Sequence, residues 1–250
     1  MFLAGKTALV TGAANRLGAQ IARTLHQNGA NLIIHYRNSG AAAQKLAQQF
    51  NTERTASAIC LQADLSDLGA PESLAQQSLE AFDGLDILVN NASSFYPTPL
   101  GEMRAQDWDD LIGSNLKAPL FLSQACYPAL RQARGNIINL LDIYASSPLK
   151  NHSLYCCAKA GNEMLVKSLA LDMAPEVRVN GIAPGAILWP EEGPSSSTER
   201  QQAIVQRIPL QRSGNPQNVT QTLLFLLGND YISGEVIRVD GGRLLTTLNR

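Results

Sequence analysis

The 250-residue sequence has almost no excess of charge of either sign. It carries 20 lysines and arginines against 21 aspartates and glutamates, a formal net charge of −1 at pH 7. Without a basic stripe, attraction to nucleic acid or to an acidic membrane surface is not expected. Long apolar runs are also missing, since none approaches the length that a membrane-spanning helix needs. Residues 1–6 lack the charged and then apolar segments of a signal peptide, so none is expected.

Cysteine and histidine are scarce, with four and three residues respectively. No cysteine forms a C-x-x-C pair or a metal-ligand spacing with histidine, so no metal site is predicted. Cys156 and Cys157 are adjacent on an expected helix, where a disulfide between them would strain the backbone. A reduced, cytoplasmic protein is the simplest expectation. Thiol-based redox control through these two residues is the alternative to a packing role.

The remaining composition is that of a globular protein, with 16% charged and 45% hydrophobic residues. Short apolar segments alternate with helical patterns along the whole chain. This alternation predicts an α/β fold, a single doubly wound Rossmann-type parallel seven-stranded sheet with helices on both faces, and one domain over residues 1–250. Strands are expected at 7–11, 31–36, 56–62, 86–90, 136–141, 177–182 and 235–239, and helices at 17–28, 41–50, from 71, 105–133, 152–173 and 216–227.

A glycine-rich segment, T-G-A-A-N-R-L-G at residues 11–18, lies between the first strand and the first helix. Gly12 permits a tight turn and Gly18 permits close packing of helix on strand, while the exposed N–H groups at the helix start can hold a pyrophosphate. Arg16 stands where many such turns have a third glycine, and could hold a cofactor phosphate and face the substrate. The alternative is a solvated arginine. The expected cofactor residues here are Gly12, Asn15, Arg16, Leu17 and Gly18.

The end of the second strand has no acidic residue for a ribose diol, which an NAD-selective site usually has. Arg37, Asn38 and Ser39 instead offer a charge and hydrogen-bond donors, which favours NADP over NAD. Asp64, at the end of the third strand, could accept from the adenine amino group. The further expected cofactor residues are His35, Tyr36, Leu65, Asn91, Ala92 and Ser93.

Tyr155 and Lys159 are four residues apart and so share a helix face, with Asp142 thirteen residues before the tyrosine. A phenol beside an ammonium is an acid whose pKa can be drawn down toward neutrality, which suits proton delivery to a substrate that receives a hydride. On its own this spacing is common, and a surface helix with an ordinary tyrosine is the alternative.

The order of these motifs, together with Asn115, Pro184-Gly185 and the closing segment 239–242, resembles the short-chain dehydrogenases/reductases over the whole chain. Most members of that superfamily have serine where this chain has Asp142. This aspartate, with Arg16 and the segment 91–99 (N-A-S-S-F-Y-P-T-P), resembles the pteridine reductases. The resemblance implies an NADPH-dependent enzyme that reduces dihydrobiopterin, dihydromonapterin or dihydrofolate to the tetrahydro form.

The resemblance also implies roles for individual residues. NADPH would lie across the strand ends, reaching Pro184 and Gly185, and Phe95 would form the wall of the pterin pocket opposite the nicotinamide, unless it is a core aromatic. Tyr155 would donate the proton and Lys159 would bind the nicotinamide ribose. Substrate contacts are expected from Arg16, Ser93, Phe95, Asp142, Tyr155, Leu188 and Trp189.

Asn115 is expected to position a water near Lys159, or else to distort its helix. Residues 185–207 are expected to form a lid, or else a variable surface loop. An ionised Asp142 can accept hydrogen bonds from the N–H groups of a pterin edge but cannot donate to a ketone oxygen. A carbonyl reductase for 3-oxoacyl or sugar substrates, and a non-catalytic NADP-binding protein, stay open as alternatives, as does the identity of the substrate tail. The resemblance further implies a homotetramer.

Overall fold

The computed structural model describes residues 1–67, 69–189 and 197–247, which form one seven-stranded sheet. Every neighbouring pair of strands is parallel, in the order β3-β2-β1-β4-β5-β6-β7. This is a Rossmann-type α/β fold, as the sequence predicts. The strands are β1 Thr7–Val10, β2 Asn31–Tyr36, β3 Ala58–Gln62, β4 Ile87–Asn90, β5 Asn136–Leu140, β6 Arg178–Pro184 and β7 Val236–Val239.

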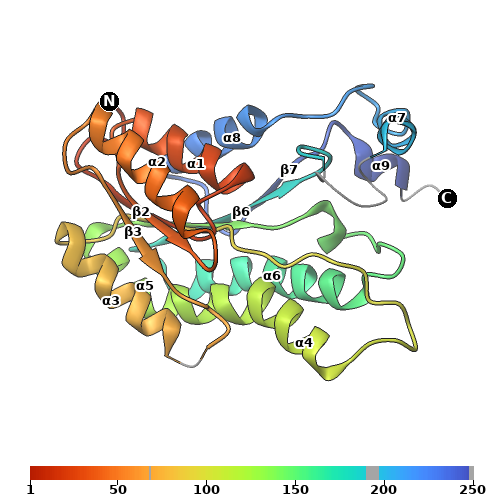
Figure 1. The fold of residues 1–250 in the computed structure, drawn as a ribbon, viewed down its shortest axis with the longest axis horizontal. Helices are drawn as coiled ribbons and strands as arrows, with labels where there is room; N and C mark the ends of the chain where they lie inside the picture. Colours follow the sequence, from red (N-terminus) through yellow and green to blue (C-terminus); the bar gives the residue numbers. More distant parts are fainter. Residues whose placement is uncertain (68, 190–196, 248–250) are drawn as a thin grey trace.

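Helices cover both faces of the sheet, with α1, α2 and α8 on one side and α3, α4, α5 and α6 on the other (Figure 1). Successive residues of a strand point to opposite faces, so β2 contributes Leu32 and Ile34 to one core and Ile33 to the other. The helices are α1 Arg16–Gln27, α2 Gly40–Glu53, α3 Ala70–Phe82, α4 Ala105–Ile112, α5 Ala118–Ala133, α6 Ser153–Asp172, α7 Thr198–Val205, α8 Pro216–Gly228 and α9 Arg243–Thr247.

The expected elements are present, with ends that differ by a few residues. Three details depart from the prediction. The helix expected over 105–133 contains a π-helical turn, Gly113–Lys117. The short helices α7 and α9 lie where no helix was expected. They are close together (Figure 1), and Thr246 Oγ in α9 donates to the carbonyl of Arg207, just after α7, at 2.8 Å. Of the expected lid, residues 190–196 lie outside the described residues. No helix of the described ranges has the length and apolarity needed to cross a bilayer.

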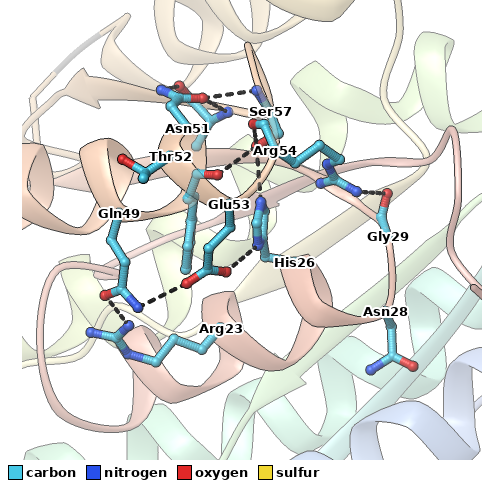
Figure 2. Close-up of polar contacts among 12 residues, drawn as sticks. Arg23, His26, Asn28, Gly29, Gln49, Asn51, Thr52, Glu53, Arg54 and Ser57 are labelled. Atoms are coloured by element: carbon cyan, nitrogen blue, oxygen red, sulfur yellow. Dashed lines mark hydrogen bonds and ion pairs between the residues drawn. The ribbon is translucent and has the colours of Figure 1, made fainter.

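A buried polar cluster joins the last turns of α1 and α2 at the end of the sheet away from the carboxyl ends of the strands (Figure 2). His26 stacks on Phe50 with ring centroids 4.3 Å apart. One ring nitrogen lies 2.8 Å from Ser57 Oγ and the other 3.4 Å from Glu53 Oε2. Arg54 donates to the carbonyls of Gly29 and Ala30, which follow α1. The cluster therefore fixes how the first two βα units pack together.

We expect His26 to weaken the fold in acid. Its pKa is lowered by burial and, next, by Arg54, although Glu53 acts the other way. The unfolded chain then binds a proton more readily than the folded chain, so stability falls as the pH drops below about 6.5, the ordinary histidine value. Relative to His26→Gln, the free energy of unfolding of the wild type should fall by up to about 1.4 kcal/mol per pH unit below that point. Urea unfolding of both proteins from pH 8 to 5 measures this, and parallel pH profiles would contradict it.

Candidate active site and cofactor cleft

A cleft of about 440 Å³ opens at the carboxyl ends of the first four strands of the chain. Crevices at this edge are where open α/β sheets bind ligands. The expected cofactor residues that line it are Gly12, Asn15, Arg16, Leu17, Gly18, His35, Tyr36, Arg37, Asn38, Ser39, Asp64, Leu65, Asn91, Ala92 and Ser93. The described residues that line this cleft do not include Tyr155, Lys159, Pro184 or Gly185. The cleft thus covers one part of the expected site, and the catalytic cluster lies beside it.

The glycine-rich turn has the backbone that its sequence predicts. Gly12 has φ +60°, and a Cβ on Gly18 would lie 2.6 Å from Asn91 Nδ2 and even nearer to the carbonyl of Gly12. Arg16 also has a positive φ, 51°, which explains why glycine is common at this place. Its guanidinium donates to the carbonyl of Trp189 at 3.2 Å, so it connects the turn to the start of the expected lid.

His35 braces the glycine-rich turn from within. Its Nδ1 accepts from the Gly12 N–H at 3.1 Å, and its Nε2 lies 3.1 Å from the carbonyl of Ala63. Both contacts are satisfied when Nε2 carries the proton, which is the neutral ring. Burial, the largest cause, lowers the pKa of His35 and so favours this form. His35 borders the cleft, but both of its nitrogens are used to hold the turn against the end of β3.

Asn91 has a similar bracing contact. Its side-chain amide donates to the carbonyls of Thr11 and Gly12, at 2.8 and 3.2 Å. The Thr11 hydroxyl in turn accepts from the backbone N–H groups of Asn91 and Ala92, both at 2.9 Å. These bonds join the ends of β1 and β4 beneath the cleft.

The end of β2 combines a cation with the start of a long helix. Arg37 is exposed and lies 3.7 Å from Asp110 Oδ1, a weak surface contact. Ser39 precedes α2, and within the described residues its side chain makes no capping hydrogen bond there. The N–H groups at the start of α2 and the Arg37 guanidinium both favour an anion.

Asp64 Oδ1 accepts from the Ser66 backbone and hydroxyl, at 3.0 and 2.7 Å.

Three of the four expected catalytic residues, Asp142, Tyr155 and Lys159, come together at the carboxyl end of β5 and the start of α6. The Tyr155 hydroxyl donates a hydrogen bond to Asp142 Oδ2 at 2.9 Å, and Asp142 Oδ1 accepts one from the Tyr144 backbone N–H at 2.9 Å. The Lys159 ammonium is buried, donates to the carbonyl of Leu140 at 2.9 Å and lies 5.7 Å from the centroid of the Tyr155 ring.

The pKa of Tyr155 does not follow the expectation from its spacing to Lys159. Burial raises the pKa of the phenol, and the Asp142 carboxylate raises it further. Burial also lowers the pKa of Lys159 to about 8, against the attraction of Asp142. The pKa of Asp142 is raised, again by burial first, although its hydrogen bonds and the nearby cations oppose this. Burial and the neighbouring carboxylate therefore keep the phenol in its protonated form.

Phe95 is exposed and lies directly over this cluster. Its ring contacts Tyr155 edge-to-face, with centroids 4.8 Å apart, and stacks on His152 at 4.8 Å. An accessible ring beside the phenol is not a core aromatic.

Nearby, Ser93 donates to Asn115 Oδ1 at 2.6 Å, so its hydroxyl links the cleft to the π-helical turn.

Asn115 is buried and lies within the π-helical turn, at a residue for which a helix-distorting role was one expectation. Its amide donates to the carbonyls of Ser94 and Leu111, at 2.9 and 3.0 Å. The backbone carbonyl of Asn115 accepts from Asn162 Nδ2 at 2.7 Å. The alternative role, positioning a water near Lys159, stays a prediction.

A chain of buried asparagines under the site was not found from the sequence. Asn90 donates to Asn139 at 2.8 Å and Asn139 donates to Asn162 at 2.7 Å, so β4, β5 and α6 are joined up to the carbonyl of Asn115. Asparagines within buried strands were a possible signal, because a buried amide needs a partner.

The expected substrate-tail residues lie at the start of the lid region. Leu188 is partly exposed, and Trp189 is held through its carbonyl by Arg16. Gly185 lies against the C-terminal turn, since a Cβ there would be 2.7 Å from Asp240 Cβ. Arg212 lines a separate hollow beside β7.

Comparison with known proteins supplies relatives along nearly the whole chain. The family model described as Enoyl-(Acyl carrier protein) reductase matches residues 12–243. Pteridine reductase 1 of Leishmania tarentolae is 37% identical, over 96% of this chain and 96% of its own. A 3-oxoacyl-(acyl carrier protein) reductase of Staphylococcus aureus is 34% identical over 95% and 97% of the two chains. L-xylulose reductase of Bos taurus is also 34% identical, over 98% of each.

Proposed function

Because the chain belongs to the short-chain dehydrogenase/reductase superfamily of oxidoreductases, we propose that it is an NADPH-dependent reductase of dihydropterins or dihydrofolate. The observation that carries this proposal is Asp142, whose carboxylate lies 2.9 Å from the Tyr155 hydroxyl. A carboxylate beside the proton donor accepts from the N–H groups of a pterin edge and gives no hydrogen bond to a ketone oxygen. The similarity to a pteridine reductase supports the same substrate class.

The residues of the cleft fit NADPH. Gly12, Asn15, Leu17 and Gly18 line the cleft at the start of α1, where backbone N–H groups would hold a pyrophosphate, and Arg37, Asn38 and Ser39 would hold the 2′-phosphate. The cofactor would extend past Ser93 to Tyr155 and Lys159, and on to Pro184 and Gly185. Bound there, NADPH supplies the hydride that the pterin receives.

The side chains of this chain would then bind the pterin and protonate it. Phe95 would stack on one face of the flat ring, which its exposed position over Tyr155 permits. Asp142 would accept from the N–H groups along one edge. Tyr155 would give its hydroxyl proton to the ring nitrogen, and the buried Lys159 ammonium would stabilise the resulting phenolate. Arg16 would contact both ligands, and its hydrogen bond to the Trp189 carbonyl connects it to that residue.

The second candidate is a ketone reductase, and the 34% identity to a 3-oxoacyl reductase and to a xylulose reductase favours it. The assay that separates the two follows NADPH absorbance with dihydrobiopterin, dihydromonapterin and dihydrofolate, and with 3-oxoacyl and sugar ketones. We expect turnover of at least one pterin substrate and little of the ketones. Turnover confined to ketones would end the proposal, and cofactor binding without turnover of any substrate would favour a non-catalytic protein.

Arg37→Ala should weaken the use of NADPH but not of NADH, because only NADPH has the 2′-phosphate. Loss of one charge-assisted contact corresponds to about 1.5–3 kcal/mol, so the KM for NADPH should rise about 10- to 100-fold. Steady-state kinetics with both cofactors measure this, with NADH as the internal control. An equal loss for NADH and NADPH would mean that Arg37 acts on the fold and not on the phosphate.

We further propose that residues 1–250 act as one catalytic unit in a homotetramer in the cytoplasm. Exposed apolar side chains on three helices, Trp108 on α4, Phe121 on α5 and Phe225 on α8, support helix-mediated association. Sedimentation gives the number of subunits. The four cysteines, all within the described residues, are free, which fits a reducing compartment.

A further inference from the structure

Tyr144, whose backbone N–H contacts Asp142, is itself contacted by a side chain from the other end of the chain, Arg243, which no sequence motif indicates. Arg243 Nη2 donates to the Tyr144 hydroxyl at 2.8 Å, and the guanidinium carbon lies 5.7 Å from the centroid of the Tyr144 ring. The backbone N–H of the same Tyr144 donates to Asp142 Oδ1. Arg243 therefore contacts the residue that holds the carboxylate in place.

The position of Arg243 is fixed by the turn that follows β7. Asp240 Oδ1 accepts from the Gly242 N–H at 2.9 Å, and its Oδ2 accepts from the Leu244 N–H at 2.8 Å. Gly242 has φ +84°, a backbone that favours glycine, so the turn needs this residue to reverse direction. Both carboxylate oxygens of Asp240 therefore hold the backbone of the turn from which the Arg243 side chain extends to Tyr144.

We propose that Arg243 is a positioning residue of the active site: it holds Tyr144 beside the catalytic cluster and places a positive charge near the Asp142 carboxylate. This inference rests on the proposed function, in which Asp142 must accept hydrogen bonds from the pterin. It adds a residue that belongs neither to the glycine-rich turn nor to the Tyr155–Lys159 pair. It also gives the C-terminal turn a role in the reaction.

The charges around Asp142 agree with this role. From α6 the Tyr155 hydroxyl and the Lys159 ammonium favour the ionised form of Asp142, and so does Arg243 from the C-terminal turn, while Cys156 on α6 also interacts electrostatically with this carboxylate. Burial favours the neutral acid, whereas Lys159 and Arg243 both favour the carboxylate. In the proposed function Lys159 must also act on Tyr155 and the cofactor ribose, and Arg243 is a second cation that opposes the effect of burial on Asp142.

The test compares the wild type with Arg243→Gln, Arg243→Lys and Tyr144→Phe. The Asp142 carboxyl carbon is followed by NMR in protein labelled with ¹³C-aspartate, and its resonance is assigned by its loss in Asp142→Asn. In Arg243→Gln, Asp142 should titrate at a higher pH than in the wild type, because a favourable charge is gone. In Arg243→Lys, Asp142 should titrate at nearly the wild-type pH. In Tyr144→Phe, it should titrate at a pH between those of the wild type and Arg243→Gln.

Kinetics supply the second measurement. With a dihydropterin, kcat/KM of Arg243→Gln should fall about tenfold at neutral pH, the loss expected for one weakened charged contact. The loss should shrink as the pH rises, because Asp142 ionises again. A merely structural role would give a loss that is independent of pH. Arg131→Gln is the matched control, because Arg131 forms an exposed pair with Glu176 at the end of α5, and it should behave as the wild type.

The inference and the proposed function fail in different ways. If the Asp142 titration is the same in the wild type and in Arg243→Gln, Arg243 has no such role, even if the pterin is reduced. If the titration moves but only ketones are reduced, the pterin assignment is wrong, and the effect of Arg243 on Asp142 stands.

Discussion

Tyr155→Phe is expected to lower kcat for dihydropterin reduction by about 10³-fold, the range in which loss of a general acid falls. The phenol is the expected proton donor, and burial and Asp142 raise its pKa, so it is fully protonated before the reaction begins. Phenylalanine retains the ring that packs against Phe95 and removes only the hydroxyl. Affinity for NADPH, measured by quenching of protein fluorescence, should change little.

The matched control is Tyr231→Phe, because the Tyr231 side chain is 98% exposed and removal of its hydroxyl should leave kcat unchanged. Turnover by Tyr155→Phe at the wild-type rate would show that another group delivers the proton. A smaller loss that disappears at low pH would point to a proton taken from water in place of the phenol.

Asp142→Ser should change the preferred class of substrate. Serine removes the acceptor that faces the pterin N–H groups and adds a hydroxyl donor suited to a ketone oxygen. Loss of charged hydrogen bonds corresponds to about a 100-fold fall in kcat/KM for the dihydropterin. The specificity constant for ketone reduction should rise with the same substitution. The ratio of the two specificity constants, measured for wild type and variant, is the quantity to compare.

Asp172→Ser, the same substitution at an exposed position late in α6, is the control and should leave this ratio unchanged. If Asp142→Ser lowers the turnover of pterins and ketones equally, the aspartate supports the site without selecting the substrate. The protein would then still be a reductase, but Asp142 would no longer favour a pterin as its substrate.

Local patterns predicted the sheet and most of the cleft because these depend on neighbouring residues. The strand-turn-helix context of residues 11–18 is sufficient to predict a turn at Gly12 and close packing at Gly18, and both are present. The contact between Asp142 and Tyr155 likewise lies within one βα unit, since it joins the end of β5 to α6. In each case the chain geometry of one βα unit decides the outcome.

Features that depend on distant segments could not be predicted in this way. Spacing places Lys159 near Tyr155 but says nothing of burial, and burial dominates the pKa of both. The π-helical turn at Gly113–Lys117 has no periodicity of its own. Arg243 reaches Tyr144 across 99 positions of sequence, a contact that only the assembled sheet brings about.

The most direct test of the account is a crystal structure of the protein with NADP⁺ and a dihydropterin. We expect the pterin to lie between the nicotinamide and Phe95, with Asp142 oxygens about 3 Å from N–H groups of its edge and the Tyr155 hydroxyl directed at the ring nitrogen to be protonated. A pterin bound away from Asp142, or an Asp142 carboxylate turned out of the pocket when both ligands are present, would contradict the account.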